Sequence, residues 1–376
     1  MSLKLRAVLT ICMVTALFFG FLHLFVQNGS LYNFERLHIF LFNLVSGGTI
    51  LIHYSEGHTR LSRRATLFMA LSLAYAVLSF KKIYLPAIVI AFILAAIVDS
   101  VRIRAFSVFP SNFFDPHAPV AEKFHQAALL CLSMGLAISG LVILNNEFLK
   151  LIYLEKLKLD TFFLGFSFPL SLITMSVMFS MMKEDVGVMV KRLKNLSFWN
   201  INLGVVIFFI FILLEMLIPQ LVVTGILFFS VVLIFLLFKN LGIRVQQKYF
   251  LTSGILFLLY TAVTGILYIP LAFNPAYTHE KMKILLRMHS FASLYGWNLS
   301  GLAVICRKDE FPIVLHSAPL IALHWITAVM LAPLGTYYRP FAILALTGYG
   351  AILYFIMFGQ KDRAVPVTQN GERWEK

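Results

Sequence analysis

The feature that most constrains this chain is a series of long apolar runs separated by clusters of charge, proline or glycine. A helix needs about 20 apolar residues to cross the hydrocarbon core of a bilayer. About twelve runs of roughly that length are predicted as spans. They are residues 7–26, 36–54, 65–80, 84–101, 124–144, 162–182, 200–218, 220–238, 249–269, 287–306, 313–334 and 340–358.

The composition indicates that the apolar side chains of these runs face lipid. Hydrophobic residues make up 60% of the chain and charged residues 13%, so one soluble core cannot bury the apolar side chains. We therefore predict an all-α, polytopic integral membrane protein, with a transmembrane helical domain at residues 1–360. The polar segment 361–376 is predicted to be a cytoplasmic tail. The first run, Val8–Phe25, is too long for the apolar part of a signal peptide and is predicted as the first span.

The positive charges indicate an orientation. With both termini in the cytoplasm, the inner loops and ends hold 21 of the 31 lysines and arginines, as the positive-inside rule requires. The net charge of +14 is therefore read as topology, and nucleic acid is not expected as a partner. The expected partner is the lipid bilayer, and the expected location is a bacterial inner membrane.

Two histidines at the heads of spans are the first candidates for chemistry. His38 follows Arg36 in span two and His289 follows Arg287 in span ten, and both are expected at the outer face. Imidazoles at equal depth on facing helices suit a six-coordinate haem iron. Arg36, Arg287 and Arg339, all expected at that level, could pair with haem propionates through their guanidinium groups.

A simpler interpretation stands beside this one. A cation and a histidine at the head of a membrane helix often extend to the interface, and Lys123-Phe124-His125 repeats the pattern at the opposite face. Spacing alone favours this simpler interpretation over a haem.

A family resemblance adds weight to the haem. Twelve spans with outer-face histidines on spans two and ten resemble the catalytic subunit of haem-copper oxygen and nitric oxide reductases, and the related NnrS-type haem proteins. The run from Arg36-Leu37-His38 to Gly47-Gly48 is similar to the second span of that family, and His289 followed by Gly296-Trp297 is loosely similar to its tenth. The resemblance implies haem b held by His38 and His289, with Arg339 at its propionates.

Departures from the family narrow the function. Arg287 stands where the family has the ligand of a second, high-spin haem. The stretches Asp160–Lys183 and Ser197–Ile218 lack the histidines that would hold copper. The resemblance therefore implies electron transfer or diatomic gas binding without a reductase site, with a redox partner or other membrane subunits as further partners. Whether the protein is an enzyme stays open.

Two further functions stay open at this point. In a cofactor-free transporter, Glu215 or the face carrying His316 and His324 would line the path, although packing or an interfacial position explains these residues as well. In a structural subunit of a membrane complex, all the polar residues would serve packing. The three cysteines, Cys12, Cys131 and Cys306, form no C-x-x-C pair and do not indicate zinc or covalently attached haem.

Overall fold

A computed structural model describes residues 1–26, 33–58, 60–152, 163–243, 245–274, 278–308 and 317–359. Their regular structure is helical, as the apolar runs predict, apart from one isolated bridge between Met182 and Gly242. Nine helices in these ranges are long and apolar enough to cross a membrane. They are Leu3–Leu24, Phe34–Glu56, Tyr84–Ala105, Val120–Leu149, Val188–Leu213, Leu217–Leu241, Gln247–Ala272, Ala318–Gly335 and Arg339–Phe358.

The remaining predicted spans are also helical, but they do not belong to these nine. Residues 65–80 lie in α4 (Arg63–Phe80), residues 162–182 contain the shorter apolar helix Gly165–Ser180, and residues 287–306 lie within the helical stretch His279–Cys306. The count of twelve therefore stays a prediction, while the helical membrane class is confirmed. The predicted tail at 361–376 lies outside the described residues.

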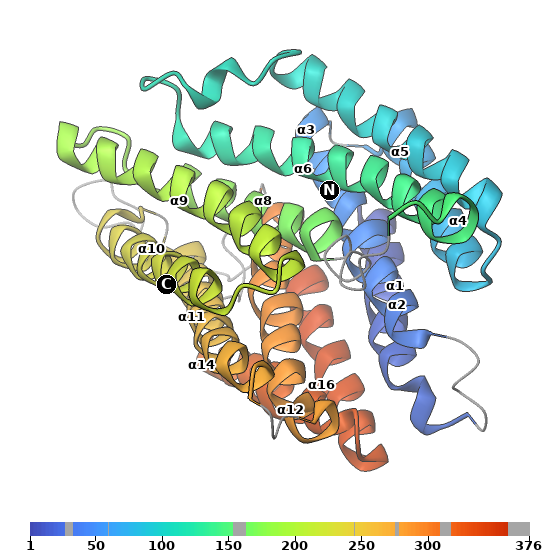
Figure 1. The fold of residues 1–376 in the computed structure, drawn as a ribbon. Helices are drawn as coiled ribbons and strands as arrows, with labels where there is room; N and C mark the ends of the chain where they lie inside the picture. Colours follow the sequence, from blue (N-terminus) through green and yellow to red (C-terminus); the bar gives the residue numbers. More distant parts are fainter. Residues whose placement is uncertain are drawn as a thin grey trace. The chain divides into compact units, whose positions relative to one another are not determined.

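The chain divides into two compact units. Unit 1 comprises Met1–Ile173 and Phe209–Glu215, and unit 2 comprises Thr174–Phe208 and Met216–Lys376. The main elements of unit 1 are α1 (Leu3–Phe21), α2 (Phe34–Ile39), η3 (Phe40–Gly48), α3 (Thr49–Glu56), α4, α5 (Tyr84–Ala105), α6 (Val120–Leu144), η5 (Asn145–Leu149) and η6 (Phe163–Ser167) (Figure 1).

Polar caps and one close helix contact explain how unit 1 is built. Asn33 accepts a hydrogen bond from the Arg36 backbone at 2.9 Å and Ser62 accepts one from the Ala65 backbone at 3.0 Å, which starts α2 and α4 in the usual way. The helices α6 and η6 meet at two glycines. A Cβ added to Gly135 would lie 2.3 Å from Gly165 Cα, so only glycine allows this approach.

Unit 2 holds the later helices, while α8 (Phe168–Ser180) and α9 (Val188–Leu213) each include residues of both units. Its other elements are α10 (Leu217–Leu241), α11 (Val245–Ala272), α12 (His279–Phe291), η7 (Ala292–Asn298), α13 (Leu299–Cys306), α14 (Ala318–Trp325), η8 (Ile326–Leu331), α15 (Ala332–Gly335) and α16 (Arg339–Phe358). The segments η3, η7 and η8 are π-helical stretches that run on from α-helices.

The hairpin predicted between spans seven and eight is present, with its turn a few residues earlier than expected. Asn200 donates to Ser230 at 3.1 Å, which places α9 and α10 side by side. Glu215 lies in the turn at φ 54°, whereas Pro219 belongs to the first turn of α10, where proline lacks only a hydrogen bond that the helix would not make. Glu215 is therefore a turn residue rather than a mid-span carboxylate.

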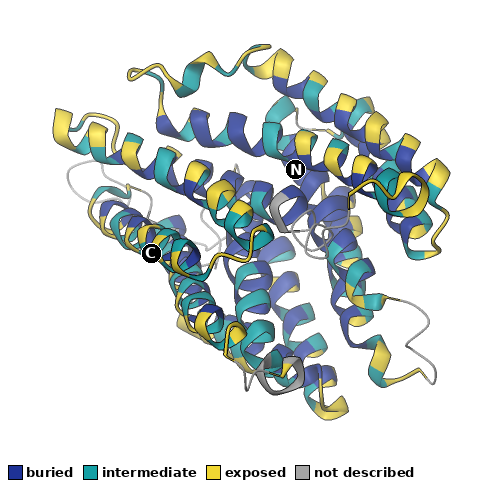
Figure 2. Ribbon diagram, viewed as in Figure 1, coloured by how far each residue is buried: buried dark blue, intermediate teal, exposed yellow. Residues whose placement is uncertain are grey.

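The helices expose much apolar surface, as a protein in contact with lipid does. Exposed and buried residues alternate along the same helices in Figure 2. Ile218 is 72% exposed and Phe229 is 71% exposed on α10, and Leu85 is 67% exposed on α5. Large apolar side chains exposed to this extent on helices long and apolar enough to cross a membrane agree with a bilayer environment.

Candidate functional site

His38 is held against the preceding helix of unit 1. Its ring nitrogen Nδ1 lies 3.1 Å from the backbone carbonyl of Ala16 on α1, and the side chain is buried. The ring also lies against Gly20, one turn further along α1, where an added Cβ would be 2.9 Å from Nδ1. Since a carbonyl only accepts hydrogen bonds, Nδ1 carries the proton and donates it to Ala16.

His289 has the same arrangement in unit 2. Its Nδ1 lies 2.9 Å from the backbone carbonyl of Thr261 on α11, and the Thr264 hydroxyl is a weaker neighbour at 3.4 Å. The ring lies against Gly265, where an added Cβ would be 3.1 Å from His289 Cε1. As in unit 1, a carbonyl and a glycine four residues later fix the imidazole on the helix that precedes it in the chain.

This arrangement prepares an imidazole to bind a metal. When Nδ1 donates its hydrogen, the neutral ring keeps a lone pair on Nε2, and a backbone carbonyl at Nδ1 is the usual outer partner of a metal-ligating histidine. Asn43, five residues after His38, is 1% exposed and neither atom of its amide has a hydrogen-bond partner among the described residues.

The three arginines lie in different surroundings. Arg36 stands two residues before His38, which on a helix turns it about 200° away from that histidine. It lines a cavity with Tyr75 and Tyr84 instead. Arg287 has the same offset from His289 and is partly exposed. Arg339 is exposed at the start of α16. Pairing of these side chains with haem propionates stays a prediction.

Two other histidines, His324 and His125, have structural contacts. His324 Nε2 lies 2.5 Å from the Tyr295 carbonyl, and its ring packs 4.8 Å from the Phe257 ring, which agrees with the packing interpretation. His125 Nε2 lies 2.7 Å from the Ser55 hydroxyl. His316 lies outside the described residues.

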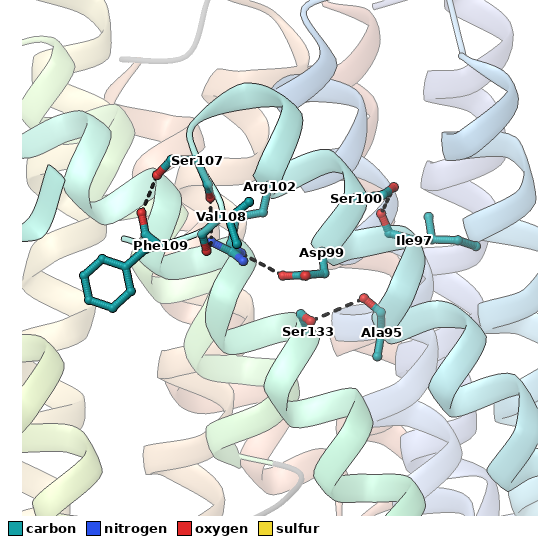
Figure 3. Close-up of polar contacts among 9 residues, drawn as sticks. All are labelled: Ala95, Ile97, Asp99, Ser100, Arg102, Ser107, Val108, Phe109 and Ser133. Carbon is teal, nitrogen blue, oxygen red and sulfur yellow. Dashed lines mark hydrogen bonds and ion pairs between the residues drawn. The ribbon is translucent and has the colours of Figure 1, made fainter. Parts of the chain in front are cut away.

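The acid at the end of span four is part of a loop anchor (Figure 3). Asp99 accepts from Arg102 at 2.8 Å, and the Arg102 guanidinium donates further hydrogen bonds to the Ser107 and Val108 carbonyls. These contacts fasten the chain that leaves α5, so a structural role accounts for the pair.

Sequence reasoning did not find the carbonyls and glycines that hold the two rings. A glycine near the C-terminal end of the helix before each histidine was a signal, because only glycine lets a ring lie directly on a helix backbone. Among the described residues, no group of three or more His, Cys, Asp or Glu could hold a metal ion. A site with two histidine ligands falls below that number. Comparison with protein-family models, curated proteins and solved structures finds no match to this chain.

Proposed function

We propose that this protein is a haem-b-binding integral membrane protein, related to the haem-copper oxidases without their copper and high-spin haem site. His38 and His289 are the proposed axial ligands. The observation that carries the proposal is the shared support of the two rings. Each Nδ1 donates to a backbone carbonyl of the preceding helix, at 3.1 Å and 2.9 Å, which is the tautomer in which a histidine binds a metal through Nε2.

The donor set suits this group. Haem iron accepts neutral imidazole nitrogens, and bis-histidine ligation supplies one-electron transfer through the ferric and ferrous states. The protein's own contribution is to fix the tautomer and orientation of both rings before any ligand arrives, since Gly20 and Gly265 bring each ring close to a helix backbone. Electron transfer or diatomic gas binding is the proposed activity, in a bacterial inner membrane with both termini cytoplasmic.

A visible spectrum of the protein extracted from membranes and purified tests the ligands. We expect a Soret band that is lost or shifted in His38→Ala and in His289→Ala, and that persists in His125→Ala. His125 is the matched control because its Nε2 is already engaged at 2.7 Å by Ser55. Size-exclusion elution identifies variants that do not fold.

Free imidazole provides a second measurement for a folded His38→Ala protein. It should enter the space left by the side chain and restore the low-spin spectrum. A protein without a Soret band, or one whose band is unchanged by the double His38→Ala and His289→Ala substitution, would end the proposal.

A cofactor-free transporter is the second candidate function. The observation in its favour is the division of the chain into two compact units near residue 173, because many transporters are built from two halves that move against each other. Uptake of a panel of labelled solutes into proteoliposomes measures this activity. Uptake that persists after removal of all bound metal would favour the transporter over the haem protein.

A further inference from the structure

One cavity in unit 1 lies where several helices end together. It has a volume of about 70 Å³. Its lining comes from the start of α2, the end of α4, the start of α5, and the end of α6 with η5. The lining residues are Arg36, Phe40, Tyr75, Ser79, Tyr84, Ser139, Val142, Ile143, Asn146 and Glu147. Because helices that cross a bilayer end at its interface, a cavity between helix ends is expected at headgroup depth.

The outer part of the cavity carries opposite charges. Arg36 is partly exposed and Glu147 is exposed, and Tyr84 lines the cavity with both of them. Asn146 adds a neutral amide beside Glu147. The cavity therefore offers a bidentate donor for an anionic oxygen group and a carboxylate acceptor for an ammonium group within one small space.

The inner part of the cavity is closed by hydroxyl groups and apolar side chains. The Tyr75 hydroxyl is hydrogen-bonded to Ser139, and the Tyr75 ring meets the Phe40 ring edge-on at a centroid distance of 5.3 Å. Both aromatic side chains are 1% exposed, so this wall is fixed by packing. The hydroxyls can bind oxygens of an anionic group, while the packed rings limit how deep a ligand extends.

Exposed apolar side chains are the chain neighbours of two lining residues. Next to Tyr84, Ile83 is 49% exposed and Leu85 is 67% exposed. Next to Glu147, Phe148 is 52% exposed and Leu149 is 53% exposed. A ligand that places charges in the cavity would lay its remaining length against these side chains, as a lipid with acyl chains does.

From these contacts we propose that the cavity binds the headgroup of a zwitterionic phospholipid with a primary amine, of the phosphatidylethanolamine class. The phosphate lies at Arg36 and the cavity hydroxyls, and the ammonium group lies at Glu147 and Asn146. A volume of about 70 Å³ exceeds the roughly 10–15 Å³ that one water needs, which leaves room for a small polar group. A choline headgroup has no N–H to donate to Glu147, and a glycerol headgroup has no cation.

Neighbouring lysines suggest a competing explanation, in which the surface attracts anionic lipids. Lys81, Lys82 and Lys150 are exposed in the loops beside the cavity but are not part of its lining. Surface lysines attract anionic lipids without selecting a headgroup. The relative affinity for different lipids therefore distinguishes a site that binds one headgroup specifically from general attraction by the lysine charges.

Native mass spectrometry of the full-length, detergent-purified protein tests the site. Phosphatidylethanolamine, phosphatidylcholine and phosphatidylglycerol are added separately at matched concentration. We expect the bound fraction to be highest for phosphatidylethanolamine, and Glu147→Gln to weaken this binding about tenfold through loss of a charge-assisted hydrogen bond. Glu122→Gln is the matched control, since Glu122 is exposed at the other end of α6 and should not change binding.

Other outcomes overturn the proposal. Equal or stronger binding of phosphatidylglycerol would show attraction by the lysines. Unchanged binding by the Glu147→Gln variant would show that Glu147 does not bind the ammonium group. Because Glu147 is exposed, this variant should fold. Glycerophosphoethanolamine, the soluble headgroup without acyl chains, separates two sources of the same chemistry. If it binds as tightly as the lipid, the ligand is a soluble zwitterion rather than a lipid.

Discussion

Replacing Gly20 by alanine should disturb the position of His38 directly. The added Cβ would lie 2.9 Å from His38 Nδ1 and 3.4 Å from both Cε1 and Cγ, so the ring must move away from α1. That movement lengthens the 3.1 Å hydrogen bond from Nδ1 to the Ala16 carbonyl. The substitution therefore removes the hydrogen bond and forces the side chain into a less favourable rotamer at once.

The expected cost follows from these two effects. A lost hydrogen bond between neutral groups costs about 0.5–1.5 kcal/mol. Overpacking of a buried side chain costs about 1–3 kcal/mol. Alanine gains about 1 kcal/mol over glycine in a helix interior. The net loss of stability is therefore about 0.5–3.5 kcal/mol.

Thermal unfolding of the detergent-purified protein, followed by intrinsic tryptophan fluorescence, measures this loss. Gly225→Ala is the matched control, because a Cβ at Gly225 meets nothing within 4 Å. Gly265→Ala should fall between the two, since its nearest contact, His289 Cε1, lies at 3.1 Å. The reasoning is refuted if Gly20→Ala and Gly225→Ala unfold at the same temperature.

The same assay tests substitutions at four other residues. Gly135→Ala should lower stability more than Gly20→Ala does, because its Cβ would meet the backbone of Gly165 at 2.3 Å and no rotamer change relieves that contact. An unchanged unfolding temperature would contradict the close approach of the two helices. Asp99→Asn should lower stability by less than about 1 kcal/mol, because it removes only a partly exposed ion pair. Arg102→Ala should lower stability more, because it also removes hydrogen bonds to two loop carbonyls. The reverse order would contradict the role of Arg102 in holding the loop. Arg307→Ala should lower the unfolding temperature, because it removes donors at 3.0 Å and 2.9 Å from two carbonyls at the end of α16. Arg307→Lys should recover only part of that loss.

Apolar period and length predicted the membrane helices well, because each span must satisfy its backbone hydrogen bonds within itself. Three predicted spans do not belong to the nine helices that are long and apolar enough to cross a membrane, and the polar residues of one of them explain why. Residues 287–306 carry Arg287, His289, Asn298 and several serines and glycines among their apolar residues, which lowers the mean hydropathy of this helix.

The local support of the histidines could not be predicted from the sequence. A hydrogen bond from His38 to Ala16 joins residues on different helices, and its formation depends on how α1 packs on the span that follows. The π-helical segments that begin two or three residues after His38 and His289 were also not visible, because they have the same residue types as α-helix. The candidate ligands were found by residue type, whereas their orientation required coordinates.

His324 shows why position before a π-helical segment is not enough to indicate a ligand. Like His38 and His289, it stands just before such a segment and gives one ring nitrogen to a carbonyl of a neighbouring element. The nitrogen is different: His324 donates through Nε2 and leaves Nδ1, the atom nearer its own backbone, buried without a hydrogen-bond partner among the described residues. The other two donate through Nδ1 and keep the outer nitrogen, which extends farther from the helix. A group bound beside the helix can reach Nε2 without distorting the backbone, so the choice of donating nitrogen supports the proposal that His38 and His289, rather than His324, are ligands.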